Sequence, residues 1–193
     1  MIERAWYRKY RPTNLDGFTF PNDDIKEVLE KYFEEGDIPD LLLSGIQGTG
    51  KSTVARMLIT MLGAKKFDVK VINASTKTGI DVIRGIEDWT KTLSTGTYKV
   101  VLFEEADRLS AFAQDALKSV IEDSPTNVKF IFTCNHPERI SDALHSRFQH
   151  LHFTELDKNS IAERLVPFDS ESRQANVSSC HVEIALVTGH HDE

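Results

Sequence analysis

The chain has 193 residues, of which 40% are hydrophobic and 27% charged, and its formal net charge is −7 at pH 7. This composition is typical of a globular protein and excludes a chain that is disordered throughout, fibrous or membrane-embedded. The charge also argues against a uniform electrostatic attraction to nucleic acid, which depends on clustered lysine and arginine.

Short apolar runs alternate with helical periodicity along most of the chain. Ile25, Leu29 and Tyr32 recur at helical spacing before Gly36, which predicts a helix over residues 23–35. Residues 41–44 are apolar without polar alternation, as in a strand covered on both faces. Later strands are predicted over residues 69–73, 100–103, 128–133 and 151–153, and later helices over residues 51–62, 79–93, 110–121, 142–146 and 157–165. Five strands alternating with helices predict an α/β fold with a doubly wound parallel sheet.

The sequence lacks signals for a membrane or an oxidising compartment. No apolar run approaches the roughly 20 residues that cross a bilayer, and residues 1–6 lack the apolar core of a signal peptide. Cys134 and Cys180 have no metal-ligand spacing, so we expect reduced thiols. We therefore expect an intracellular, cytoplasmic protein, or one in the host cytoplasm if it is viral.

A glycine-rich loop joins the first predicted strand to the helix over residues 51–62. Residues 45–52 fit the pattern G-x-x-x-x-G-K-[ST] in the strand-to-helix context that it requires. The glycines let backbone N–H groups converge on phosphates, Lys51 reaches the β- and γ-phosphates of an NTP, and Ser52 ligates Mg²⁺. A chance glycine-rich turn is the alternative. The predicted nucleotide-binding residues of this segment are Gly45, Gly48, Thr49, Gly50, Lys51, Ser52 and Thr53.

Two adjacent acids end a later strand. Glu104 and Glu105 follow the apolar run at residues 100–103, at the carboxyl end where open α/β sheets place their ligands. We assign Glu104 to the Mg²⁺ shell and Glu105 to polarising the attacking water. Two solvated acids at a strand end are the alternative.

Six separated motifs occur in a recognisable order. They are residues 6–12 (Trp-Tyr-Arg-Lys-Tyr-Arg-Pro), 45–52, 73–75 (Asn-Ala-Ser), 104–107 (Glu-Glu-Ala-Asp), 135 (Asn) and 146–148 (Ser-Arg-Phe). Together they resemble the clamp-loader ATPases of the AAA+ family, such as replication factor C small subunits and the large subunits of T-even-type phage loaders. The resemblance covers roughly residues 4–166. It implies a P-loop NTPase of the AAA+ type that uses ATP and Mg²⁺ and is active only within a hetero-oligomer or a homo-oligomeric ring or spiral.

The resemblance assigns further roles at the nucleotide. Lys9, Tyr10, Arg11 and Pro12 match the segment that lies against the adenine, although a basic N-terminal arm is the alternative. Asn73 matches a switch residue that holds the catalytic glutamate away from water until DNA binds. An asparagine that caps the next turn is the alternative reading of that position.

Two more residues match catalytic positions. Asn135 matches sensor 1, which orients the attacking water or contacts the γ-phosphate, and a loop asparagine is the alternative. Arg147 matches the arginine finger, which supplies positive charge to the transition state at a neighbouring subunit's nucleotide. The tripeptide Ser-Arg-Phe alone is uninformative. With Lys51 and Glu105, these residues complete the predicted catalytic set.

The family resemblance also implies partners. We expect a subunit that binds primer-template DNA together with other clamp-loader subunits and opens a sliding clamp during DNA replication. Side chains that contact the phosphates of DNA position the duplex without reading its sequence. The candidate DNA contacts are Lys77, Thr78, Arg84, Arg108 and Lys118, with solvated surface charge as the alternative for each. The rival functions are an assembly subunit that binds ATP but hydrolyses it poorly, and another AAA+ DNA motor such as a branch-migration helicase.

The sequence departs from the family pattern in two respects. Glu104 stands where the family usually has aspartate, and one extra methylene displaces a carboxylate from octahedral Mg²⁺ geometry. We also expect the chain to lack the family's complete helical lid and collar. We predict an ATP-binding domain over residues 1–155, the start of a lid over residues 156–168 and a divergent or disordered tail over residues 169–193.

Overall fold

The computed structural model describes residues 12, 14–76 and 79–156. Several sequence predictions lie outside these residues, and they remain predictions. They are the adenine segment Lys9, Tyr10 and Arg11, the DNA contacts Lys77 and Thr78, Cys180, the lid and the tail. Among the described residues, no helix combines the length and the apolar character needed to cross a membrane.

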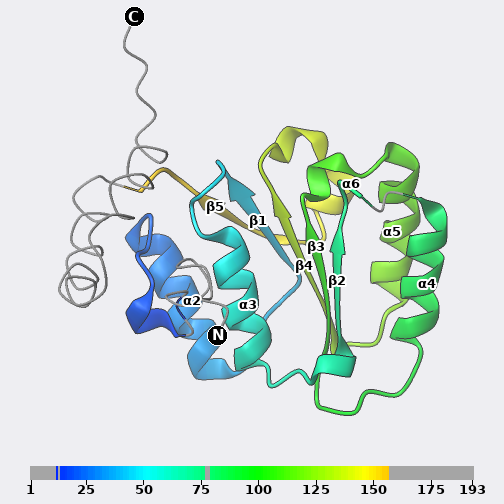
Figure 1. The fold of residues 1–193 in the computed structure, drawn as a ribbon, viewed down its shortest axis with the longest axis horizontal. Coiled ribbons are helices and arrows are strands. Elements are labelled where there is room, and N and C mark those ends of the chain that lie inside the picture. Colours follow the sequence, from blue (N-terminus) through cyan, green and yellow to red (C-terminus); the bar gives the residue numbers. More distant parts are fainter. Residues whose placement is uncertain (1–11, 13, 77–78, 157–193) are drawn as a thin grey trace, which may run out of the picture. The chain divides into compact units, whose positions relative to one another are not determined.

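A five-stranded sheet organises the described residues, and every strand pair in it is parallel (Figure 1). The strand order is β2-β3-β4-β1-β5. The strands are β1 (Leu41–Gly45), β2 (Val69–Asn73), β3 (Lys99–Glu104), β4 (Val128–Cys134) and β5 (Gln149–Phe153). The helices are α2 (Asp23–Glu35), α3 (Lys51–Met61), α4 (Ile80–Thr90), α5 (Ala111–Asp123) and α6 (Asp142–His145), with short 3-10 turns at Leu15–Gly17, Lys66–Asp68, Ala106–Arg108 and Pro137–Arg139. The predicted α/β fold is confirmed.

Helices cover both faces of the sheet and create two apolar cores. Helices α2 and α3 pack on one face, and α4 and α5 on the other (Figure 1). In β1, Leu41 and Leu43 face the core beneath α2 and α3, and Leu42 faces the core beneath α4 and α5. Because both faces are buried, this strand is apolar at consecutive positions instead of alternating with polar residues.

Helix α4 is shorter than its sequence pattern predicts. The pattern extends to residue 93, whereas the helix ends at Thr90. Lys99 is only 1% exposed, and its ammonium group donates hydrogen bonds to the carbonyl oxygens of Trp89 (2.6 Å) and Thr92 (2.5 Å). The Trp89 carbonyl oxygen also accepts hydrogen bonds from the Thr92 N–H group (3.1 Å) and hydroxyl (2.8 Å). Lys99 thus adds a contact from the next strand to a helix end that is already hydrogen-bonded locally.

Strand β5 begins two residues earlier than predicted. Gln149 pairs with Leu41, and its N–H group donates to the Asp40 carbonyl oxygen at 2.8 Å. Gln149 and His150 are exposed, because β5 is an edge strand. A search for apolar runs therefore misses the polar start of this strand.

Candidate active site

The glycine-rich loop follows β1 and leads into α3, as predicted. Gly45, Gly48 and Gly50 have φ values of 136°, 90° and 91°. This left-handed region is strained for residues with a side chain but accessible to glycine. The loop can therefore turn its N–H groups toward a bound anion at the N-terminus of α3, where the helix dipole also favours negative charge.

Close packing also requires glycine at Gly45 and favours it at Gly50, where only the Phe18 ring would have to shift. A Cβ atom on Gly45 would lie 2.1 Å from the Phe153 carbonyl oxygen, and one on Gly50 would lie 2.7 Å from the Phe18 ring. Strand β5 thus fixes the start of the loop, and the segment before α2 fixes its end.

Substitution of Gly45 by alanine is expected to destabilise the fold by about 2 to 3 kcal/mol, because it combines backbone strain with overlap against β5. Urea unfolding measures this change. The matched control is Gly63→Ala, where φ is 64° and a Cβ would meet no atom within 4 Å. That control should lose only about 1 kcal/mol. Equal losses in the two variants would show that the contact with Phe153 is unimportant.

Lys51 lies beneath the loop and is 7% exposed. Its ammonium group donates to the carbonyl oxygens of Gly45 (2.7 Å) and Ile46 (2.6 Å). Burial lowers the pKa of Lys51, while the nearby Asp107 carboxylate acts in the opposite direction. An ammonium group has three N–H donors, so one remains for a phosphate oxygen.

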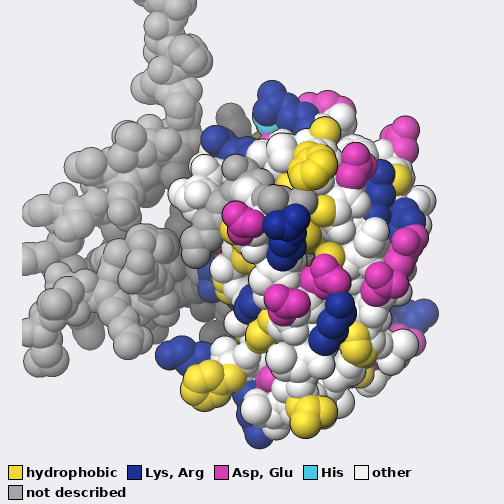
Figure 2. Space-filling model, turned by 90° about the vertical axis from the view of Figure 1, so that its right-hand side faces the viewer, with side chains coloured by type: hydrophobic (Ala, Val, Ile, Leu, Met, Phe, Trp, Pro, Cys, Tyr) yellow, Lys and Arg dark blue, Asp and Glu magenta, His cyan; other side chains and the backbone are white. Residues whose placement is uncertain are grey.

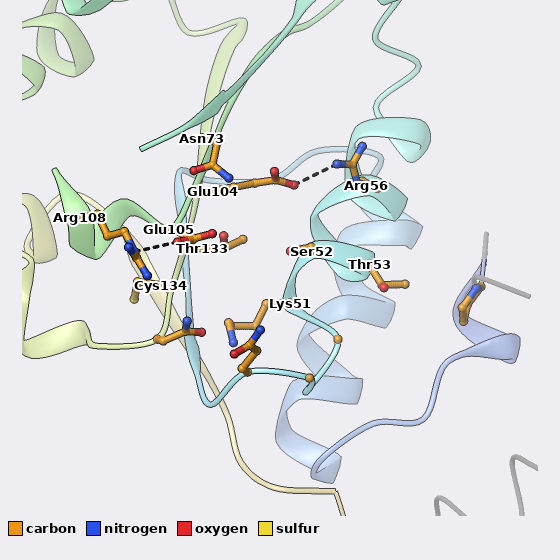
Figure 3. Close-up of a pocket in the computed structure, with 15 residues that line it drawn as sticks. Lys51, Ser52, Thr53, Arg56, Asn73, Glu104, Glu105, Arg108, Thr133 and Cys134 are labelled. Atoms are coloured by element: carbon orange, nitrogen blue, oxygen red, sulfur yellow. Dashed lines mark hydrogen bonds and ion pairs between the residues drawn. The ribbon is translucent and has the colours of Figure 1, made fainter. Parts of the chain in front are cut away.

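A cavity of about 730 Å³ opens beside the loop. In Figure 3, side chains of α3 lie on one side of it and side chains from the ends of β2, β3 and β4 lie opposite. The predicted site residues that line it are Pro12, Gly48, Gly50, Lys51, Ser52, Thr53, Asn73, Glu104, Glu105 and Asn135. Gly45 and Thr49 are buried within the loop, where the Thr49 hydroxyl donates to the Ile46 carbonyl oxygen at 2.9 Å.

The two predicted metal ligands reach the same cavity from opposite sides. Ser52 comes from α3 and Glu104 from the end of β3 (Figure 3). A hydroxyl and a carboxylate are oxygen donors of the kind that Mg²⁺ prefers, and nucleotide phosphates normally complete its shell. The described residues contain no group of three or more histidine, cysteine or acidic side chains arranged to hold a metal. The donor set therefore fits Mg²⁺ bound together with a nucleotide.

Glu105 has an unusual backbone conformation and an arginine partner. Its φ of 58° makes it the sole non-glycine residue with positive φ in the described part of the chain. Its carboxylate forms an ion pair with Arg108 Nε at 2.8 Å. A strained backbone at a cavity residue costs about 1 kcal/mol or more and is frequent at functional sites.

Asn73 caps the turn that follows β2. Its side-chain oxygen accepts hydrogen bonds from the Ser75 N–H group (2.8 Å) and the Ser75 hydroxyl (2.5 Å). This geometry matches the turn-capping alternative, while the position of Asn73 at the cavity keeps it near Glu104 and Glu105. The switch role stays a prediction.

The loop after β4 is anchored by Asp107, an acid of the motif at residues 104–107 to which the sequence analysis gave no role. The Asn135 N–H group donates to the carboxylate of the buried Asp107 at 3.2 Å. Asp107 thereby fixes the backbone that carries Asn135. The adjacent Cys134 lines the cavity, and burial raises the pKa of its thiol to about 12, so the thiol is protonated at neutral pH.

Arg147 follows α6 and is not among the cavity residues. Its guanidinium group donates to the Ala143 carbonyl oxygen and forms an ion pair with Glu122 of α5. A residue that acts on a neighbouring subunit's nucleotide does not need to reach the cavity of its own chain. The arginine-finger assignment stays a prediction.

The described DNA-contact candidates each pair with an acid. Arg84 lies 3.5 Å from Asp81 on α4, and Lys118 lies 2.5 Å from Asp115 on α5. Arg108 pairs with Glu105, as described above. Figure 2 shows the face that α4 and α5 form, on which basic and acidic side chains are intermixed. DNA contact by this face stays a prediction.

The structure adds five cavity residues that were not assigned to the nucleotide site: Gln47, Arg56, Arg108, Thr133 and Cys134. Arg56 could have been found from the sequence, because it lies four positions after Ser52 and so shares its helix face. Thr133 and Cys134 end β4, where a parallel sheet places its ligands.

Comparison with known proteins decides the family. The model of the AAA family, described as "ATPase family associated with various cellular activities", matches residues 41–156. This chain belongs to the AAA family of ATPases. The match includes β1, the glycine-rich loop and all the later strands.

Curated relatives are replication factor C small subunits. The chain is 36% identical to the protein of Saccharolobus solfataricus, in an alignment that covers 85% of this chain and 51% of the relative. It is 32% identical to the protein of Methanococcus vannielii, in an alignment that covers 99% of this chain and 62% of the relative. It thus spans about half the length of the first of these proteins. The predicted resemblance to replication factor C small subunits is confirmed.

Solved structures share the fold of this AAA-family chain. The RuvB Holliday junction branch migration motor of Thermotoga maritima is 23% identical, with a TM-score of 0.63 over 83% of this chain and 55% of that one. A DNA polymerase III gamma subunit-related protein of the same organism is 20% identical, with a TM-score of 0.57 over 69% of this chain and 46% of that one. At this identity the likeness concerns the fold alone.

Proposed function

We propose that this chain is an ATP-hydrolysing subunit of a DNA polymerase sliding-clamp loader. The observation that carries the proposal is the 36% identity to a replication factor C small subunit, which extends over 85% of the chain. The cavity residues predicted for ATP and Mg²⁺ support the same function. We propose an intracellular location, where such a loader would act in DNA replication.

In this proposal the loop and Lys51 bind the phosphates of ATP. Backbone N–H groups around Gly48 and Gly50 donate to the phosphate oxygens, and the free donor of Lys51 contacts the β- and γ-phosphates. Ser52 and Glu104 would hold the Mg²⁺ ion, either directly or through water. The bound metal would offset the negative charge that develops during phosphoryl transfer.

Hydrolysis is assigned to side chains on the opposite wall of the cavity. Glu105 accepts a proton from the attacking water through the carboxylate oxygen that does not contact Arg108, and Asn135 orients that water. Arg147 of a neighbouring subunit supplies positive charge at the γ-phosphate. The partners are other loader subunits, the sliding clamp and primer-template DNA.

The test is ATP hydrolysis by the chain mixed with its cognate loader subunits, with and without primer-template DNA and sliding clamp. We expect turnover that DNA and clamp stimulate and that Lys51→Met abolishes. ATP binding without turnover under all conditions would instead indicate an assembly subunit. Stimulation by branched DNA without any effect of the clamp would indicate a branch-migration motor.

A further inference from the structure

Arg56 and Glu104 form an ion pair across the nucleotide cavity. The distance between Arg56 Nη2 and Glu104 Oε1 is 2.9 Å, and the side chains are 45% and 22% exposed. In Figure 3 the Glu104 side chain extends from the end of β3 toward α3, where Arg56 meets it one helical turn beyond Ser52. The basic side chain therefore lies beside both predicted Mg²⁺ ligands.

The length of Glu104 matters for this contact. A carboxylate on Asp would end about one carbon–carbon bond, roughly 1.5 Å, closer to β3. At that length the 2.9 Å contact with Arg56 would open unless the arginine side chain or the helix moved. The residue at which this chain departs from the family pattern is thus the residue that the arginine engages.

We propose that the Arg56 guanidinium group neutralises the Glu104 carboxylate in the nucleotide site when no metal is bound. This ion pair makes ATP binding by the chain only weakly dependent on Mg²⁺. This inference rests on the proposed ATP-binding function and extends it to a residue outside the glycine-rich loop.

Electrostatics supports this role. Without a cation, the Glu104 carboxylate repels the phosphates of ATP, and in a partly buried site that repulsion is stronger than in water. Arg56 neutralises the carboxylate through one contact. A guanidinium group has five N–H donors, so others remain available for phosphate oxygens.

The same geometry predicts how the pair responds to the metal. For Glu104 to join a Mg²⁺ shell, its carboxylate must turn away from Arg56. The cost of breaking the ion pair then offsets part of the gain from metal binding. The affinity for ATP therefore changes little between metal-free and metal-containing solution, because one cation replaces another beside the same carboxylate.

The test is the Kd of ATP for the full chain, measured by calorimetry in EDTA and in excess Mg²⁺. In Arg56→Met, we expect the Kd in EDTA to rise roughly three- to fivefold, as for the loss of a half-exposed charge pair. The Kd in Mg²⁺ should change less than about twofold, because the metal then neutralises Glu104. Arg56→Lys, which keeps the charge, should retain most of the metal-free affinity.

A second variant separates pairing from simple phosphate contact. In Glu104→Gln the carboxylate charge is absent. Arg56→Met should therefore weaken ATP binding in EDTA less in the Glu104→Gln background than in the parent chain. Equal losses in EDTA and Mg²⁺, additive effects in the double variant, or no effect of Arg56→Met would each overturn the proposal. Absence of Lys51-dependent ATP binding in the parent chain would overturn the proposed function as well.

Discussion

Replacement of Lys51 by methionine is expected to weaken ATP binding roughly a hundredfold or more. The ammonium group is buried beneath the loop and has one donor free for the phosphates. Loss of a buried, charge-assisted contact of this kind costs about 3 to 5 kcal/mol. Isothermal titration with ATP and Mg²⁺ measures the change directly, and hydrolysis by the assembled loader should be lost with it.

The variant should remain folded, because methionine replaces the aliphatic part of the lysine side chain. The carbonyl groups of Gly45 and Ile46 lose a donor, which costs about 1 to 2 kcal/mol of unfolding free energy. Lys65→Met is the matched control, since Lys65 is an exposed lysine that donates to the Thr95 carbonyl oxygen at 2.8 Å. The control should bind ATP normally. Unchanged ATP affinity in Lys51→Met would contradict the assignment of the loop to phosphate binding.

The second large effect is expected for Glu105→Gln, which should lower single-turnover hydrolysis by roughly 10²- to 10⁴-fold, the range for loss of a positioned general base. Glutamine keeps the size of the side chain and tolerates the same backbone but accepts no proton. ATP affinity should stay within a few-fold of the parent value. Hydrolysis is measured in the assembled loader with DNA and clamp, and ATP affinity is measured on the chain alone.

Loss of the ion pair with Arg108 should not explain this effect, because that pair is substantially exposed and contributes little to stability. Glu87→Gln is the matched control, since Glu87 is also ion-paired, to Lys91 at 2.7 Å on α4. The control should hydrolyse ATP normally. Parent-like turnover in Glu105→Gln would remove the general-base assignment and direct attention to Glu104.

The ion pairs of Glu104 and Glu105 could not be predicted from the sequence, although the pattern assigned these acids to Mg²⁺ and to the attacking water. Adjacent acids at a strand end predict a ligand site, but their partners come from different directions. Arg56 lies 48 positions away on α3, whereas Arg108 lies in the next turn. The first contact depends on how α3 packs against the sheet, which no local pattern encodes.

Local chemistry in the sequence by itself determined the strands, the glycine-rich loop and the candidate acids. Apolar runs indicate buried parallel strands, and glycine spacing indicates a phosphate-binding turn, because both depend on residues close in the chain. Only the tertiary structure decided that Asp107 anchors the backbone of Asn135, that Lys99 contacts the end of α4 and that Arg56 engages Glu104. These contacts join separate elements, and their distances depend on the register of the sheet and the packing of the helices on it.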